Sequence, residues 1–300
     1  MNFLELAYDQ GVFRAALFLV AAAAFAQAPR PLGELIDVGG YRVHLYCTGQ
    51  GSPTVMITGA GFSFDWGLVQ PHVAKFTRVC TYDVSGTAWS EPGPASTCTA
   101  RVQEIHTLLE KANVHGPFVL AGLSIGALVA RLYAHEYPKD VAGMVIIDHA
   151  FLDPEPARPK PQPNPRSDGV TPPVLILQTP IEPSVEDISH FEKLPEQDRK
   201  LHRWAMSLNP AMPTVEMARE CAAQVGLTLG SMPLAVVSTG NRDAAYLRLQ
   251  QQLLGLSRKN THRVADQSIH AVEIDQPDVV IAAIRDVVDA ARATLPRPLR

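Results

Sequence analysis

The stretch Gly122-Leu123-Ser124-Ile125-Gly126 constrains the fold of this chain more than any other. An apolar run at 117–121 precedes it, and a helical pattern at 127–133 follows it. A strand that turns sharply at a serine and continues as a helix is the context of a G-x-S-x-G nucleophile elbow. The tight turn requires residues without bulk two positions before and after the serine, where the glycines stand. The pattern predicts that Ser124 is a nucleophile whose side chain stands clear of a sheet.

Apolar segments alternate with helical patterns along the rest of the chain. After a first hairpin, the expected strands are continuous apolar runs, which is typical of buried parallel strands. The expected strands lie at 33–38, 41–47, 55–57, 77–82, 118–121, 143–147, 234–238 and 262–264. The expected helices lie at 66–76, 99–112, 127–133, 186–208, 215–225, 244–256 and 277–293. We therefore expect an α/β fold: a twisted, mostly parallel, eight-stranded sheet with helices on both faces.

Residues 151–230 interrupt this alternation. Prolines recur every few residues between 154 and 173, which indicates a solvated, extended segment. The run at 174–177 is open between a short strand and the buried start of another layer. We interpret 151–230 as an inserted, mainly helical cap over the carboxyl ends of the strands, where such sheets bind ligands. The core then comprises residues 27–150 and 231–300.

Residues 1–26 have the features of a targeting segment. An apolar stretch of 12 residues ends at Ala24-Phe25-Ala26, which fits the small-x-small rule for signal-peptide cleavage before Gln27. Cleavage there would make the protein secreted or periplasmic. Glu5 and Asp9 make the preceding region poorly basic, so the alternative is a retained anchor at the membrane surface. We expect membrane association only in that second case.

Composition narrows the range of functions. A chain that is 46% apolar and 19% charged forms a sizeable core, and its net charge of −4 without a Lys/Arg run does not favour nucleic-acid binding. No dinucleotide fingerprint, phosphate-binding loop or zinc motif occurs, so we expect neither a cofactor nor a metal. Disulfides and buried free thiols both remain open for the four cysteines. These are Cys47, Cys80, Cys98 and Cys221.

A serine hydroxyl needs a base within hydrogen-bond reach and a carboxylate that orients the base. In this topology the chain order is serine, acid, histidine. His270 lies in a loop between the last expected strand and the last helix, which makes it the expected base. Two residues at strand carboxyl ends fit the acid. Asp148 ends the strand after the elbow helix, and Asp243 follows a later strand, where it could instead cap a helix.

The charge that develops on a substrate oxygen needs two backbone donors, which form an oxyanion hole. One is expected to be the N–H of Ile125, directly after the nucleophile. The other is expected from the loop 59–62, with the N–H of Phe62 as first choice. The alternatives in this loop are Ala60 and Gly61. Phe64 and Trp66 follow as candidates to line a substrate pocket, although aromatic residues at this spacing also occur in cores.

Beyond the elbow, several stretches resemble the α/β-hydrolase superfamily. Residues 82–94 resemble its Y-D-x-x-G-x-G-x-S-x-P stretch, and Asp275-Gln276-Pro277 resembles the D-Q-P after its histidine loop. Residues 131–134 and 141–148 are similar to a subgroup of capped bacterial hydrolases. That subgroup often carries its acid after the elbow helix, which favours Asp148 over Asp243.

The chain departs from the superfamily pattern at three positions, where Ala88 and Ile269 replace glycines and Leu123 replaces a common histidine. The dehalogenases and epoxide hydrolases of the superfamily use an aspartate as nucleophile, so Ser124 argues against both. The resemblance and the motifs together predict a serine hydrolase that acts on small carboxylic esters. The same triad could serve acyl transfer, amide or peptide cleavage or cofactor-free perhydrolysis. A protein that only binds ligands on this scaffold is the alternative from another class.

Overall fold

The computed structural model describes residues 28–59, 61–94, 97–149, 190–210, 213–225, 228–240 and 244–294. Contacts divide the chain into Met1–Leu32 and Gly33–Arg300, and every element below lies in the second unit. The predicted targeting segment 1–26, the proline-rich stretch and the run at 174–177 lie outside the described residues. In the part of the chain that is described, no helix has the length and apolar character needed to cross a bilayer.

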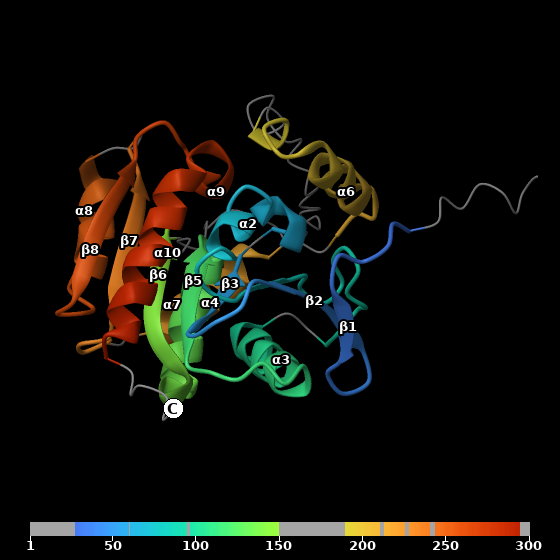
Figure 1. Cartoon of the computed structure of the whole chain (residues 1–300), viewed down its shortest axis with the longest axis horizontal. Coiled ribbons are helices and arrows are strands. Elements are labelled where there is room, and N and C mark those ends of the chain that lie inside the picture. The colour runs from blue at the N-terminus through green and yellow to red at the C-terminus, as the bar shows by residue number, and fades with distance from the viewer. Residues whose placement is uncertain are drawn as a thin grey trace, which may run out of the picture. The chain divides into compact units, whose positions relative to one another are not determined.

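Eight strands form one sheet in the order β1-β2-β4-β3-β5-β6-β7-β8, with β1 and β8 at opposite edges (Figure 1). The first two pairings, β1 with β2 and β2 with β4, are antiparallel, and all others are parallel. The strands are β1 (Glu34–Asp37), β2 (Arg42–Thr48), β3 (Thr54–Thr58), β4 (Val79–Tyr82), β5 (Phe118–Leu123), β6 (Val141–Ile147), β7 (Leu234–Thr239) and β8 (Asn260–Ala265). The predicted eight-stranded, mostly parallel sheet is confirmed.

Helices cover both faces of the sheet, as predicted. On one face α2 and α10 pack on the strands, while α3, α4, α7 and α8 contribute to the core on the other. Figure 1 shows α10, in red, running across β6 and β7. The helices are η1 (Ser63–Trp66), α2 (Gln70–Val73), α3 (Cys98–Lys111), α4 (Ile125–Glu136), η2 (Pro138–Asp140), α6 (Glu196–Ser207), α7 (Val215–Gln224), α8 (Ala244–Leu254), α9 (Val272–Asp275) and α10 (Pro277–Arg292).

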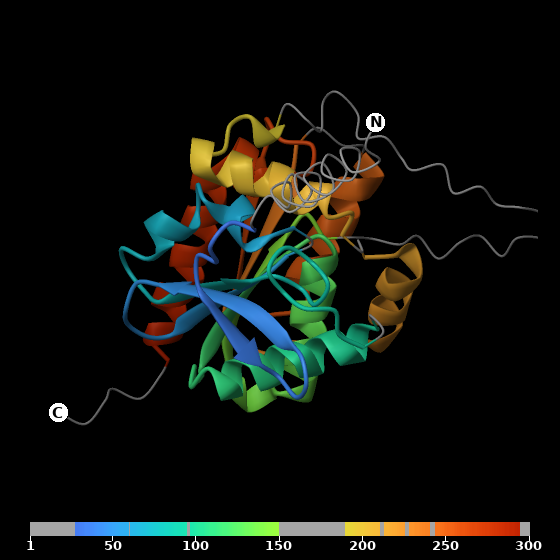
Figure 2. The same cartoon turned by 90° about the vertical axis from the view of Figure 1, so that its right-hand side faces the viewer.

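The two described helices of the predicted cap differ in position. Helix α6 packs against η1, which follows β3 at the carboxyl edge of the sheet. Figure 2 shows α6 in yellow beside the cyan segment that contains η1. Helix α7 instead packs on α3 and α4. Its Met217, Ala218 and Cys221 are buried in the core of that face. Helix α7 therefore belongs to the same layer as α3 and α4 on one face of the sheet, because its apolar side chains are buried against these two helices.

All four cysteines are paired. Cys47 joins Cys80 across the antiparallel strands β2 and β4, where the two residues are direct partners in the register. Cys98 at the start of α3 joins Cys221 of α7, across a sequence separation of 123 residues. The second bridge links α7 covalently to α3. The sequence left open whether the four cysteines form disulfides or remain free thiols, and in the structure they form two disulfides.

Candidate active site

Ser124 occupies the sharp turn between β5 and α4. Its φ of 55° and ψ of −121° lie in a region that L-residues rarely adopt, which is the strained geometry of a nucleophile elbow. A Cβ at Gly122 would lie 2.5 Å from the carbonyl oxygen of Gly126, and a Cβ at Gly126 would lie 2.1 Å from that of Thr58. Neither approach is sterically tolerable, so the turn requires both glycines.

Asp148 and His270 meet at the carboxyl edge of the sheet. The His270 Nδ1 atom lies 2.5 Å from Asp148 Oδ2, with side-chain exposures of 51% and 3%. The N–H of Asp148 donates to the carbonyl oxygen of Val237 at 2.8 Å, which continues the pairing of β6 with β7 past the end of β6. Asp148 has a φ of 38°, a left-handed conformation at the strand end. The alternative acid, Asp243, lies outside the described residues.

The loop that carries His270 is held by the residues of the D-Q-P stretch. The hydroxyl of Ser268 donates to Asp275 Oδ2 at 3.0 Å, and the N–H of Gln267 donates to Gln276 Oε1 at 2.7 Å. Both acceptors lie beyond His270 in the sequence, so they close the loop around it. These contacts account for the position of His270 although Ile269 stands where the superfamily has glycine.

Thr239, the last residue of β7, was not among the predicted site residues. Its Oγ1 lies 3.4 Å from Asp148 Oδ1, the carboxylate oxygen that does not face His270. The two carboxylate oxygens of Asp148 thus face two different elements. The one sequence signal for Thr239 was its position at the carboxyl end of a strand. Many polar residues occupy such positions without a role in a site, so this signal does not single out Thr239.

In the loop between β3 and η1, Phe62, the first choice for the second oxyanion donor, has its N–H already bonded, which corrects that prediction. The N–H of Phe62 donates to Asp65 Oδ2 at 2.9 Å, and the next N–H, that of Ser63, donates to Asp83 Oδ1 at 2.7 Å. A donor that already serves a buried carboxylate is not available to a substrate oxygen. Gly61 remains as the described alternative, since Ala60 lies outside the described residues. Ile125 is the first residue of α4, and the backbone N–H of a first helical residue has no hydrogen-bond acceptor within the helix. The predicted donor Ile125 therefore does not serve a hydrogen bond of its own helix.

The two aromatic residues predicted to line a pocket are buried in the protein. Trp66 is 3% exposed and belongs to the core under α2 and α10. Phe64 is 1% exposed and packs against Phe62 and Trp89, with ring centroids 5.1 and 5.6 Å apart. Both side chains turn inward from the helical turn η1 that they share, and their role in lining a substrate pocket stays a prediction.

A buried acid lies close to these groups. Glu273 of α9 follows His270 by three residues, and its side chain is buried. Burial, and then the negative charges of Asp65, Asp275 and Asp148, raise the pKa of Glu273 to about 8. The carboxyl group of Glu273 therefore stays protonated at neutral pH.

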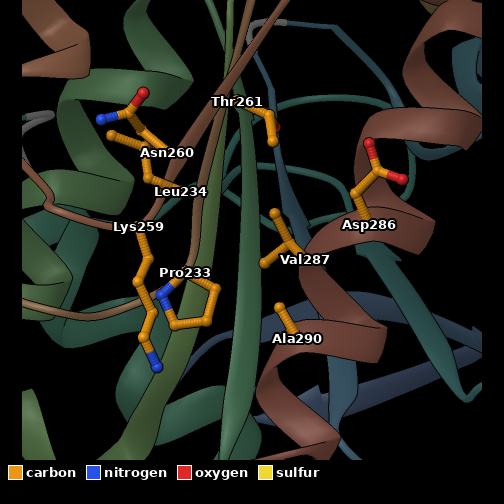
Figure 3. Close-up of a pocket in the computed structure, with 8 residues that line it drawn as sticks. All are labelled: Pro233, Leu234, Lys259, Asn260, Thr261, Asp286, Val287 and Ala290. Carbon is orange, nitrogen blue, oxygen red and sulfur yellow. The ribbon is translucent and has the colours of Figure 1, made fainter.

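A separate pocket of about 200 Å³ opens at the other edge of the sheet (Figure 3). Leu234 and Asn260 begin the parallel strands β7 and β8, so this pocket lies at the amino-terminal edge, away from Ser124. Its lining comprises Pro233, Leu234, Lys259, Asn260, Thr261, Asp286, Val287 and Ala290. Among the described residues, no cluster of three or more His, Cys, Asp or Glu side chains could hold a metal ion.

Residues 54–283 match the alpha/beta hydrolase family. The chain belongs to this family. The resemblance seen in the motifs is thereby confirmed, and the protein is assigned to a superfamily of hydrolases.

Two curated proteins are similar to this chain in sequence. The uncharacterized protein YqjL of Bacillus subtilis (strain 168) is 26% identical over 249 residues, which cover 80% of this chain and 85% of YqjL. The 2-hydroxymuconate semialdehyde hydrolase of Pseudomonas sp. (strain CF600) is 29% identical over 130 residues, 40% of this chain and 44% of the relative.

Two solved structures share the fold at low sequence identity. The meta-cleavage product hydrolase of Pseudomonas fluorescens IP01 superposes with a TM-score of 0.61 at 17% identity, covering 87% of this chain and 98% of that one. A thermophilic esterase of Thermogutta terrifontis gives a TM-score of 0.57 at 17% identity, covering 86% and 97%. At this identity the likeness establishes the fold alone.

Proposed function

We propose that this protein is a serine hydrolase that cleaves small carboxylic esters through an acyl-enzyme intermediate. The observation that carries the proposal is the pairing of His270 with Asp148 at the sheet edge where the elbow presents Ser124. Enzymes that catalyse nucleophilic acyl transfer use a strained serine at a helix N-terminus together with a histidine that a buried carboxylate orients.

In the proposed reaction each of these residues has a specific role. Since Asp148 faces Nδ1, the proton of neutral His270 resides there, and Nε2 is left to accept the proton of the Ser124 hydroxyl. Ser124 Oγ attacks the ester carbonyl, and the N–H groups of Ile125 and of Gly61 or Ala60 stabilise the negative charge on its oxygen. His270 then returns the proton to the leaving alcohol. Water, deprotonated by His270, releases the acid.

The proposal is tested by labelling with a fluorophosphonate, which reacts with activated serines. The native protein should be labelled and should hydrolyse p-nitrophenyl esters, and Ser124→Ala should do neither. Labelling that persists in Ser124→Ala would reject Ser124 as the nucleophile. A native protein without label or turnover would favour a ligand-binding protein on a hydrolase scaffold.

The names of two similar proteins favour a second substrate class. By their names, one is a hydrolase of 2-hydroxymuconate semialdehyde and the other is a hydrolase of a meta-cleavage product. Both substrate classes require attack at a carbonyl, so the same residues would serve. Comparing kcat/KM for a series of esters of graded chain length with kcat/KM for 2-hydroxymuconate semialdehyde decides between the two classes.

We further propose that the protein acts outside the cytoplasm. The two disulfides support this location, because such bonds persist in oxidising compartments. Mass spectrometry of the mature protein should find an N-terminus at Gln27. An intact Met1 would instead favour the retained membrane-surface segment.

A further inference from the structure

A buried carboxylate fixes the loop that is expected to supply the second oxyanion donor. Asp65 Oδ2 accepts the N–H of Phe62 at 2.9 Å, and a Cβ at Gly61 would lie only 2.4 Å from the same oxygen. The carboxylate of Asp65 is thus packed directly onto the backbone of Gly61 and Phe62. It holds this backbone from the side of η1, and no larger residue fits at position 61 without displacing it.

The second oxygen of Asp65 connects this loop to α6. His202 Nδ1 lies 2.8 Å from Asp65 Oδ1, and the two side chains are 13% and 5% exposed. The His202 ring stacks on Phe191 with centroids 3.7 Å apart and meets the edge of Phe62 at 5.5 Å. Helix α6 therefore contacts the loop twice, through the carboxylate of Asp65 and through the side chain of Phe62.

The neighbouring carboxylate provides a contrast. Asp83 accepts the N–H of Ser63, and its partner is His44, whose Nδ1 lies 2.8 Å from Asp83 Oδ2. His44 belongs to β2, so this His–Asp pair ties the loop to the sheet. The pair of Asp65 and His202 ties the preceding residue to a helix that follows β6 in the chain and packs on η1.

We propose that Asp65 is a positioning residue for the oxyanion-loop backbone at Gly61 and Phe62, and that its bond to His202 makes the conformation of this backbone depend on α6. The inference rests on the proposed function of Ser124. An oxyanion hole stabilises charge only if its donors are held in place before the reaction. Loss of the carboxylate frees the N–H of Phe62 and lets the Gly61 segment relax away from the substrate oxygen.

A purely structural role makes a different prediction. If Asp65 and His202 only attached α6, their loss would lower stability and the fraction of folded enzyme but leave each folded molecule fully active. The measurement must therefore be made per active serine. Titration with a fluorophosphonate counts those serines, and a trifluoromethyl ketone, which forms a charged tetrahedral adduct, probes the oxyanion hole itself.

The test compares Asp65→Ala, Asp65→Asn and His202→Ala in the full-length protein. We expect Asp65→Ala to lower kcat per labelled serine about 10- to 100-fold and to weaken ketone inhibition by the same factor, with KM little changed. Asp65→Asn should restore most of the loss, because its amide oxygen still accepts the N–H of Phe62. His202→Ala should change kcat and inhibition in the same direction by a smaller factor.

The matched control is Thr77→Val, which removes a buried hydrogen bond of 2.6 Å to the carbonyl of Pro53 at the amino-terminal side of β4. It should lower thermal stability without changing kcat per labelled serine. Native kcat and native ketone inhibition in Asp65→Ala would overturn the inference. If Asp65→Ala does not fold, unchanged inhibition in His202→Ala overturns it instead. A native protein that is not labelled at Ser124 would overturn the proposed function and this inference with it.

Discussion

Asp148 and His270 are 122 residues apart in the sequence, yet their carboxylate oxygen and ring nitrogen lie 2.5 Å apart in the fold. Two elements produce this contact. Strand β6 ends at the carboxyl edge of the sheet and leaves Asp148 beyond its last pair, while the loop after β8 returns His270 to the same edge. The orienting contact to the histidine is thus made beside the elbow strand, at the end of β6.

Asp148→Asn should lower kcat for ester hydrolysis by about four orders of magnitude with little change in stability. The amide cannot stabilise a protonated His270 and favours the wrong tautomer, as a comparable triad substitution does elsewhere. Steady-state kinetics on a p-nitrophenyl ester measures the effect. Asp243→Asn is the matched control and should retain near-native kcat. The opposite ranking would assign the acid to Asp243, and small losses in both variants would exclude both.

Gly126→Ala should disrupt the elbow. The new Cβ would lie 2.1 Å from the carbonyl oxygen of Thr58, a backbone atom at the end of β3 that cannot rotate aside. We expect a destabilisation of about 1–3 kcal/mol by urea unfolding and loss of fluorophosphonate labelling. Gly255→Ala is the control, because its Cβ would meet only the carbonyl oxygen of Gln252, at 3.2 Å. Native labelling of Gly126→Ala would contradict the steric argument.

The sheet could be predicted from sequence because each element carries a local signal. Buried parallel strands need continuous apolar runs, and the elbow needs Gly122 and Gly126 around a strained Ser124. His270 followed from chain order, and Asp148 from the family resemblance. The signals for the strands and for the elbow lie within a few residues of the element that they specify, whereas His270 was selected by the order of residues along the chain.

What the sequence left open depends on contacts between distant segments. The disulfide of Cys47 with Cys80 requires β2 and β4 to be neighbours, although β3 lies between them in the chain. The Phe62 N–H looked available because the fold of η1, which brings Asp65 back onto it, is a local detail without a strong pattern. The contact of His202 with Asp65 spans 137 residues and has no sequence signal.

Removing the two disulfides should destabilise the protein unequally. A crosslink restricts the unfolded chain more when it closes a longer loop, and the sequence separations are 123 residues for Cys98–Cys221 and 33 for Cys47–Cys80. Loop entropy predicts losses of about 5 and about 4 kcal/mol for the respective double alanine variants. Urea unfolding of each variant measures them. A larger loss for the shorter loop would show that native packing outweighs chain entropy.

Stability should fall as pH rises from about 4.5 to 8, and Glu273 should account for much of the fall. The unfolded chain releases this proton near the ordinary glutamate pKa of 4.5, whereas burial and the neighbouring carboxylates keep it bound in the folded protein up to about 8. Because the folded state binds more protons in this window, its stability is greatest below pH 4.5 as far as this group is concerned, and each pH unit costs about 1.4 kcal/mol. Asp198, whose pKa burial and then Asp65 raise to about 6, adds a smaller contribution of the same sign.

Glu273→Gln removes the titrating group while keeping its shape. Plotted against pH, the unfolding free energy of the native protein minus that of Glu273→Gln should therefore decline between pH 4.5 and 8 and level off above. Glu110→Gln, at an exposed position on α3, serves as the control for the loss of a surface carboxyl group. A difference for Glu273→Gln that does not change with pH would mean that this carboxyl ionises in the folded protein as readily as in the unfolded chain. Burial of the carboxyl group and the negative charges of Asp65, Asp275 and Asp148 would then be too weak to raise its pKa in the folded protein.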